Sequence, residues 1–368
     1  MKNEKILFLS LHSFSLTGGI EKVCRCVSKI LSDLNTLSKN NHQLLSLYDD
    51  QPDSKYIDAK SFKGFNGKRL AFLFNTIRIG LNANTILLSH INLLLFAWIL
   101  NKIQPKKRII LIAHGIEIWT ELPKWKTRFL QKSTEVWAVS EYTARQIQKI
   151  HHLVPAKIKI LNNSLDPFFS IPAGFSKPGM LSQRYQLSSS TKVLFTLTRL
   201  SSQEQYKGYD QVILALKNLP EDVIYILAGK ADEKEEARVL SLIAAHKLVH
   251  RVILTGFLAE DEVQKHFLLA DLFVMPSKGE GFGIAFIEAA ACGLASIAGN
   301  ADGSRDALLN GKLGDFVDPN NVEELSKAIA KHLALPKSAA DALHLQKLCL
   351  NAFSFEQYKT NFLNLLSN

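Results

Sequence analysis

The stretch that decides the fold is residues 279–293, which read Gly-Glu-Gly-Phe-Gly-Ile-Ala-Phe-Ile-Glu-Ala-Ala-Ala-Cys-Gly. A strand-like run at 272–276 precedes it and helix formers follow from about 284 to 292, which predicts a strand, a glycine loop and a helix. Free N–H groups at such a helix N-terminus favour an anion. The only carboxylate of residues 282–292 is Glu288, in a helix that we expect to be buried because it is apolar on every side. A buried carboxylate needs partners, and either the hydroxyls of a ribose or a neighbouring cation would satisfy it.

Two glutamates, Glu280 and Glu288, enclose a segment that begins with Gly281, Phe282 and Gly283. This arrangement resembles the donor-site signature of retaining glycosyltransferases of the GT-B fold, in the large family called group 1. In that family the first glutamate lies near hydroxyls of the donor sugar, the second binds the ribose, and the loop amides face the sugar and the phosphates. The resemblance implies these roles here. The alternative is an ordinary strand-to-helix turn with a salt-bridged Glu288.

The chain has 368 residues, which suits two domains because single cores stop growing near ~250 to 300 residues. Its four cysteines and eleven histidines show no spacing typical of a metal site or a disulfide framework, so we predict no metal. The N-terminal residues do not resemble a signal peptide, and the apolar stretch 91–100 is half the roughly 20 residues that span a bilayer. We therefore expect a soluble, cytoplasmic protein.

The net charge of +10 is unevenly distributed. Residues 1–175 contain 24 Lys and Arg against 12 Asp and Glu, a net charge of +12, whereas residues 176–368 carry −2. Such an asymmetry usually indicates a partner of opposite charge, so we expect the first half to meet something anionic. A nucleic acid is one possibility, but this half carries no recognised nucleic-acid motif and its cations are spread over many helices. We predict no nucleic-acid partner.

The first half alternates strand-like and helical stretches, which predicts a parallel sheet with helices on both faces. The expected strands are 5–10, 43–47, 85–89, 108–112 and 135–139. We interpret residues 49–70, which are polar and charged, as mobile or as an insertion. Ligands of open α/β sheets bind at the carboxyl ends of the strands, where we expect the loops at Gly18-Gly19, at 114–117 and at 140–141.

Two of these loops match the family. Gly18 and Gly19 follow the first strand without the G-x-G-x-x-G of a dinucleotide site, and they are similar to a loop beside the donor phosphates and the acceptor in GT-B transferases. A plain tight turn is the alternative. His114 follows an apolar strand and precedes a glycine, similar to the acceptor-side motif in which a histidine contacts the transferred sugar. The alternative is a structural histidine.

The composition changes at 167–180, which hold three prolines and two glycines and are expected to be the linker. A second domain then begins with a strand at 192–198, followed by Arg199 and Lys207. These resemble the basic pair that neutralises the donor diphosphate in the family, because cations at a strand end and a helix start can stabilise a leaving group. The alternative is a pair of surface cations. Further strands lead to Gly229, and to Phe257 and Leu258, where the base of the nucleotide would lie.

The resemblance covers nearly the whole chain and implies an α/β protein with two Rossmann-like domains facing a cleft. Residues 1–172 would form the acceptor-side domain and 181–350 the nucleotide-sugar domain, with a C-terminal helix at about 353–368 packing back on the first. The implied reaction is hexosyl-type transfer with retention, from a nucleotide-diphosphate sugar to a glycan or lipid-linked acceptor of surface polysaccharide or glycolipid biosynthesis, without metal or cofactor. The alternative function is a catalytically silent binding or scaffold protein.

A last expectation concerns the acceptor. Residues 121–132 could form a short basic helix containing Lys124, Lys126 and Arg128 beside Trp125. Such a helix can lie at an anionic membrane surface, so the protein would be peripheral on the inner face of the membrane. The alternative is a solvated helix face whose tryptophans turn inward.

Overall fold

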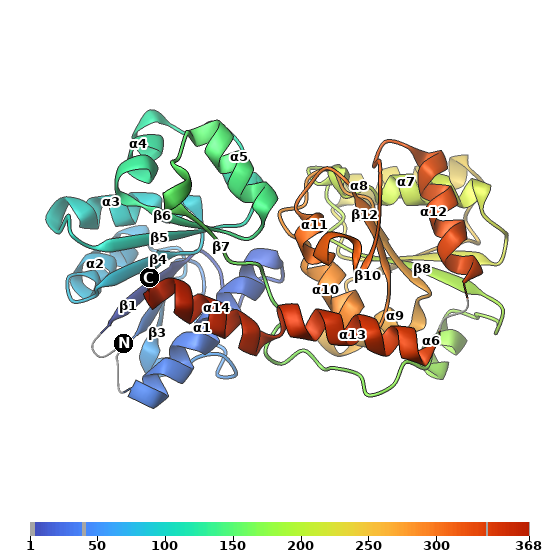
Figure 1. The fold of residues 1–368 in the computed structure, drawn as a ribbon, viewed down its shortest axis with the longest axis horizontal. Helices are drawn as coiled ribbons and strands as arrows, with labels where there is room; N and C mark the ends of the chain where they lie inside the picture. Colours follow the sequence, from blue (N-terminus) through green and yellow to red (C-terminus); the bar gives the residue numbers. More distant parts are fainter. Residues whose placement is uncertain (1–3, 39–41, 336–337, 368) are drawn as a thin grey trace. The chain divides into compact units, whose positions relative to one another are not determined.

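The structure is a computed structural model that describes residues 4–38, 42–335 and 338–367. The chain divides into two compact units, the first formed by residues 1–168 and 354–368 and the second by residues 169–353 (Figure 1). Residues 161–178 contain no helix or strand, and the boundary falls among them.

The first unit is built on a parallel sheet of seven strands in the order β3-β2-β1-β4-β5-β6-β7. The strands are β1 Ile6–Ser10, β2 Gln43–Ser46, β3 Phe62–Gly64, β4 Thr85–Leu88, β5 Arg108–Ala113, β6 Glu135–Ala138 and β7 Ile158–Ile160. The helices are α1 Gly19–Ser38, α2 Arg69–Gly80, α3 Leu94–Ile103, α4 Lys124–Ser133, α5 Glu141–His151 and, from the end of the chain, α14 Phe355–Ser367.

The central strands β1, β4 and β5 are buried on both faces, as expected when helices cover both. Leu7 and Leu9 belong to a core with Phe72 of α2 and Phe96 of α3. On another part of the sheet Trp137 of β6 meets Phe362 of α14, with ring centroids 5.2 Å apart. The expected helix at the end of the chain is confirmed, and it belongs to the first unit.

The interpretation of residues 49–70 as mobile is wrong, whereas their interpretation as an insertion stays a prediction. They contain β3, which pairs in parallel with β2 at the edge of the sheet. Tyr56, Ile57 and Phe62 are buried, so isolated apolar residues among the charges anchor the segment to the core. A strand of three residues is too short to give an alternating pattern, which is why the sequence did not indicate it. The edge strand β7 was missed for the same reason.

The second unit contains a parallel sheet of six strands in the order β10-β9-β8-β11-β12-β13. The strands are β8 Lys192–Leu197, β9 Val223–Ala228, β10 Val252–Gly256, β11 Leu272–Met275, β12 Ser296–Gly299 and β13 Gly314–Val317. The helices are α6 Gly179–Arg184, α7 Tyr209–Ala215, α8 Glu233–Ala245, α9 Glu260–Leu269, α10 Ile284–Ala291, α11 Ser304–Ala307, α12 Val322–Ala334 and α13 Ala339–Phe353.

Two successive residues of β8, whose side chains point to opposite faces, show how this sheet buries both faces. Leu194 joins a core that includes Tyr209 of α7 and Ile329 of α12. Its neighbour Phe195 instead packs edge-on against Phe267 of α9, with ring centroids 5.3 Å apart. Figure 1 shows α7 and α12 on one side of the sheet and α9 and α10 on the other. The predicted α/β architecture with two Rossmann-like units is therefore confirmed.

Candidate active site

The candidate donor site lies at the carboxyl edge of the second sheet, in the loop between β11 and α10. Gly283 is the residue before α10 and has φ of 92°, which a side chain would make unfavourable. A Cβ there would also lie 2.4 Å from the Phe286 ring. Phe282 is buried and packs edge-on against Phe353, with 5.6 Å between ring centroids. The packing of Phe282 against Phe353 thus holds the glycine loop in place. The loop ends at the N-terminus of α10, a helix of eight residues.

Glu288 lies within α10, whose other side chains are almost entirely apolar. Its exposed fraction is 2%, so the expectation that this helix is buried is confirmed. A carboxylate so far from solvent is costly unless a polar or charged group faces it. Helix α10 is in turn held by α13, where Gln346 donates a hydrogen bond of 2.9 Å to the Ala291 carbonyl.

The structure brings Lys207 and Glu280 together. The Lys207 ammonium lies 2.6 and 2.9 Å from the two carboxylate oxygens of Glu280, and each side chain is 13% exposed. Burial opposes the charged ammonium, yet Glu280 and Tyr206 hold the pKa of Lys207 above its ordinary value. The family resemblance implied a place for Lys207 near the diphosphate and for Glu280 near the sugar, but it did not indicate that they form one partly buried ion pair.

The backbone also locks these two loops together. The Lys278 N–H donates to the Tyr206 carbonyl at 2.8 Å. Gly208, with φ of 78°, passes so close to the other loop that a Cβ would lie 2.3 Å from the Pro276 carbonyl oxygen. The loop that carries Lys207 therefore has little freedom to move independently of the glycine loop.

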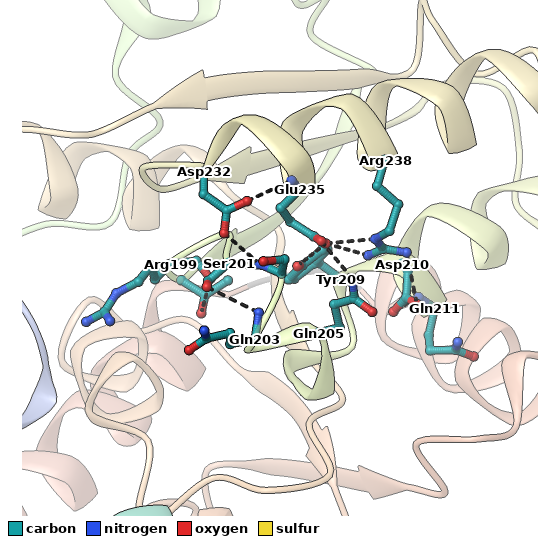
Figure 2. Close-up of polar contacts among 12 residues, drawn as sticks. Arg199, Ser201, Gln203, Gln205, Tyr209, Asp210, Gln211, Asp232, Glu235 and Arg238 are labelled. Carbon is teal, nitrogen blue, oxygen red and sulfur yellow. Dashed lines mark hydrogen bonds and ion pairs between the residues drawn. The ribbon is translucent and has the colours of Figure 1, made fainter.

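The other predicted cation, Arg199, pairs with a different carboxylate. It follows β8, its side chain is 57% exposed, and it contacts Glu204 at 3.3 Å. Figure 2 shows its guanidinium pointing away from a polar cluster around Tyr209 and Glu235. Unlike Lys207, Arg199 therefore has a solvent-exposed cationic head.

That polar cluster supports the loop between β8 and α7 (Figure 2). The buried carboxylate of Glu235, on α8, accepts hydrogen bonds from Tyr209, from Gln205 at 2.8 Å and from Arg238 at 2.6 Å. Asp232, the residue before α8, accepts from the Ser202 N–H at 2.8 Å. The sequence did not indicate this support, since nothing in its local pattern links a helix start to a loop some 30 residues earlier.

The remaining predicted donor residues lie at the ends of β9 and β10. Gly229 has φ of 147°, and a Cβ there would meet the Thr198 carbonyl oxygen at 1.6 Å, so only glycine fits. Phe257 is 59% exposed, whereas Leu258 is buried. Phe257 is thus available for contact with a flat ligand, while Leu258 belongs to the core.

In the first unit, Gly18 and Gly19 lie at the start of α1. A Cβ on Gly19 would have no atom within 4 Å, which leaves open space beside the helix N-terminus. The preceding loop is organised by Asp49, a buried residue after β2 whose carboxylate accepts from the Ser13 N–H at 2.7 Å and the Ser15 N–H at 2.9 Å. The sequence missed Asp49, which lies more than 30 residues from the loop that it holds.

His114 lies directly after β5, as predicted. Its Nε2 is 2.9 Å from the Ser89 carbonyl oxygen, which can only accept, so Nε2 carries the proton. Its backbone N–H donates to Glu117 at 2.6 Å. Burial lowers the pKa of His114 from 6.5 to about 4, so the ring is neutral near pH 7. The hydrogen bond of Nε2 is that of a structural histidine, which was the alternative to a sugar contact. The other ring nitrogen, Nδ1, makes no hydrogen bond to the described part of the chain.

Two general findings bear on cofactors and membranes. Among the described residues, no group of three or more His, Cys, Asp or Glu side chains is arranged to hold a metal ion. Within those same residues, no helix combines the length and apolar character needed to cross a bilayer.

The two units, with their parallel sheets, have the architecture of the GT-B glycosyltransferases. Over its full length the chain superposes on Anabaena HepE in complex with UDP and glucose, with a TM-score of 0.79 and 20% identity over 100% of both chains. The apo form of the lipopolysaccharide outer core galactosyltransferase WaaB gives a TM-score of 0.74 at 16% identity, covering 98% of this chain and 99% of that one. Residues 181–343, which lie within the second unit, match the family model described as glycosyl transferases group 1.

Curated relatives are similar to the chain over part of its length. A GDP-mannose-dependent alpha-(1-6)-phosphatidylinositol monomannoside mannosyltransferase of Mycolicibacterium smegmatis is 29% identical over 64% of this chain and 63% of its own length. The protein of the same name from Mycobacterium tuberculosis is 31% identical over 61% of this chain and 60% of its own length. The chain thus spans somewhat over half the length of these relatives.

Proposed function

We propose that this protein is a retaining glycosyltransferase that moves a hexosyl group from a nucleotide-diphosphate sugar to an acceptor in glycolipid or surface polysaccharide biosynthesis. The observation that carries the proposal is the partly buried Lys207–Glu280 ion pair at the glycine loop, together with the buried Glu288 in the helix that follows this loop. The second unit would bind the donor and the first unit the acceptor.

The ion pair has a direct chemical use in such a reaction. Lys207 is held beside a helix N-terminus, where a diphosphate is favoured. When the donor binds, its negative charge competes with Glu280 for the ammonium, and the released carboxylate can accept hydrogen bonds from the sugar. As the bond to the sugar breaks, charge grows on the leaving diphosphate, and Lys207 with Arg199 would stabilise it. This assignment requires neither metal nor cofactor.

Mannose is the sugar that we propose, with GDP-mannose as the donor. The support comes from the relatives, because the mycobacterial proteins are named for GDP-mannose and a serotype-specific mannosyltransferase of Escherichia coli is 24% identical over 55% of this chain. The exposed Phe257 at the end of β10 gives a purine a surface on which to stack.

The test is donor hydrolysis and transfer by the purified full chain. Release of nucleoside diphosphate is measured for GDP-mannose, GDP-glucose, UDP-glucose and UDP-galactose, with and without detergent-solubilised lipid extracts as acceptor and with and without EDTA. We expect release with GDP-mannose that EDTA does not affect. We also expect the anomeric carbon of the transferred sugar to have the same configuration in the product as in the donor. Binding of a nucleotide sugar with no release in the presence of any acceptor would instead support the silent scaffold. Binding of nucleic acid without nucleotide sugar would overturn both.

We also propose that the acceptor lies at an anionic membrane surface. Helix α2 exposes Leu70 and Phe74, 84% and 66% accessible, and α3 exposes Ile103 at 51%. These helices pack on each other, and α3 packs on α4. We call the solvent-facing side chains of α2, α3 and α4 the α2–α4 surface. Its exposed apolar side chains are large and stand at separate positions, so they suit insertion among lipid headgroups.

The charge of the α2–α4 surface supports this partner. The sequences of α2, α3 and α4 contain no carboxylate and seven Lys and Arg residues, namely Arg69, Arg78, Lys102, Lys124, Lys126, Arg128 and Lys132. On α4, Lys126 lies over the Trp125 ring, whose centroid is 5.7 Å from that of Trp98 on α3. Trp125 remains 36% exposed, whereas Phe129 and Leu130 of the same helix face the core. The alternative of tryptophans turned fully inward therefore does not describe Trp125.

A further inference from the structure

A buried carboxylate that the sequence did not indicate lies against the glycine loop. Asp302, in the loop after β12, is 1% exposed. Its Oδ2 accepts from the Glu280 N–H at 2.8 Å and from the Ser277 hydroxyl. Its Oδ1 accepts from the N–H and the hydroxyl of Ser304, at 3.0 and 2.5 Å. One oxygen thus holds the glycine loop and the other holds the start of α11.

The next residue holds the same loop from its other side. The Gly303 N–H donates to the Glu280 carbonyl at 2.8 Å. A Cβ at Gly303 would lie 2.1 Å from the Gly281 carbonyl oxygen, so the two loops are in backbone contact. Both backbone polar groups of Glu280 are therefore fixed by residues 302 and 303, while its side chain meets Lys207.

The chemistry at this position requires a carboxylate. All four partners of Asp302 are donors, and an ionised carboxylate offers up to four acceptor sites and no donor. An asparagine would turn an NH2 group toward either the Glu280 N–H or the Ser304 N–H, and two donors would face each other. Burial raises the pKa of Asp302 although its four hydrogen bonds favour the ionised form.

We propose that Asp302 is a positioning residue of the donor site: by fixing the backbone of Glu280, it sets where the Glu280 carboxylate meets the donor sugar. This inference rests on the proposed function. Asp302 itself is too buried to touch the donor, so its effect on the donor passes through Glu280. Its effect should therefore be confined to the sugar end of the donor, because Glu288, on α10, addresses the ribose.

That division gives a test with two ligands. Calorimetry on the full chain compares GDP with GDP-mannose for the wild type and Asp302→Asn, with UDP and UDP-glucose as a second pair. We expect Asp302→Asn to weaken GDP-mannose binding roughly tenfold, the loss of about one hydrogen bond to a charged group, and GDP binding less than about twofold. Equal weakening of both ligands would overturn the proposal, since a general loss of structure does not distinguish them.

Two serines provide matched variants if Asp302→Asn does not fold. Ser277 and Ser304 are both fully buried and both donate to Asp302, from the glycine loop and from α11 respectively. Ser277→Ala should change the ratio of GDP-mannose to GDP affinity in the direction expected of Asp302→Asn, and Ser304→Ala should leave it unchanged. Equal ratios for the two variants would count against positioning through the loop. Failure of the wild type to bind any nucleotide sugar would instead refute the proposed function itself.

Discussion

At the scale of single residues, Glu288 makes the most direct prediction. Glu288→Gln keeps the size of a side chain that is 2% exposed but removes its charge. If the carboxylate binds the ribose, nucleoside diphosphate affinity should fall by about 1 to 3 kcal/mol, the range for a charge-assisted hydrogen bond. Calorimetry with GDP measures it, and Glu236→Gln on the exposed side of α8 is the control. A folded Glu288→Gln variant that binds GDP as the wild type does would exclude this role.

Lys207 should act on the rate of transfer and less on binding. Because negative charge on the diphosphate grows in the transition state, Lys207→Ala should lower kcat more than it raises KM. The exposed Lys278 lies on the neighbouring loop, so Lys278→Ala controls for a general loss of positive charge. Initial rates over a range of GDP-mannose concentrations separate the two constants. A change in KM alone would make Lys207 a docking residue.

Two histidines predict how stability depends on pH. Burial lowers the pKa values of His42 and His114 from 6.5 to about 4. The folded chain then binds fewer protons than the unfolded chain between these values, so the stability that both residues contribute is present above pH 6.5 and lost as the pH falls toward 4. The free energy of unfolding, measured in urea at several pH values, should decline over this window. His42→Gln should flatten the decline, and an unchanged profile would contradict the assignment.

Sequence reasoning found side chains at this scale but not their partners. Glu280 and His114 follow apolar strands and Glu288 lies in the apolar helix after the glycine loop, all in recognisable motifs, so their places could be predicted. The Lys207–Glu280 pair joins residues 73 positions apart, and Asp302 lies 22 positions from the Glu280 N–H that it binds. Such contacts depend on which strands are neighbours. The sequence does not state that β8 lies between β9 and β11.

At the scale of elements, α14 is the clearest case of a helix that stabilises a sheet formed by a distant part of the sequence. Phe362 is fully buried against Trp137, and Arg108 donates to the Leu365 carbonyl at 2.8 Å near the end of the helix. Phe362→Ala should reduce the stability of the first unit by roughly 3 to 5 kcal/mol, the cost of deleting a buried aromatic ring. Leu343→Ala, at a position 41% exposed on α13, should cost less than about 0.5 kcal/mol.

Tryptophan fluorescence reports this effect selectively. All four tryptophans, Trp98, Trp119, Trp125 and Trp137, lie in the first unit. Urea unfolding followed by their emission should therefore shift with Phe362→Ala. The same emission should be insensitive to Leu343→Ala, because α13 belongs to the second unit. An unshifted transition for Phe362→Ala would mean that α14 does not stabilise the first sheet.

The elements themselves were predictable where they are long or strongly apolar. The strands with four or more buried residues in the first unit were all expected, as was α10 with its glycine loop. β3 and β7, with three residues each, were not expected. Their pairing with the longer neighbours β2 and β6 stabilises them, and this pairing leaves no pattern in their own sequences.

At the scale of the whole molecule, the charge asymmetry makes the last prediction. Lys124, Lys126 and Arg128 lie on α4, within the α2–α4 surface, and each basic residue near an anionic leaflet contributes roughly 1 kcal/mol. Replacing all three with alanine should therefore weaken binding to phosphatidylglycerol liposomes on the order of 100-fold in co-sedimentation. Salt should weaken wild-type binding as well, since it screens exposed charges.

The matched variant removes three cations from the same unit away from that surface: Arg145, Lys149 and Lys159, all exposed. It has the same net charge as the α4 variant, so a general attraction between a basic protein and an anionic membrane would affect both equally. Only a specific orientation through the α2–α4 surface predicts a difference. Adding Leu70→Ser and Phe74→Ser should weaken binding further and leave its salt dependence unchanged, because inserted apolar side chains contribute without charge. Binding that ignores lipid charge, salt and the α4 substitutions would make a soluble acceptor the better interpretation.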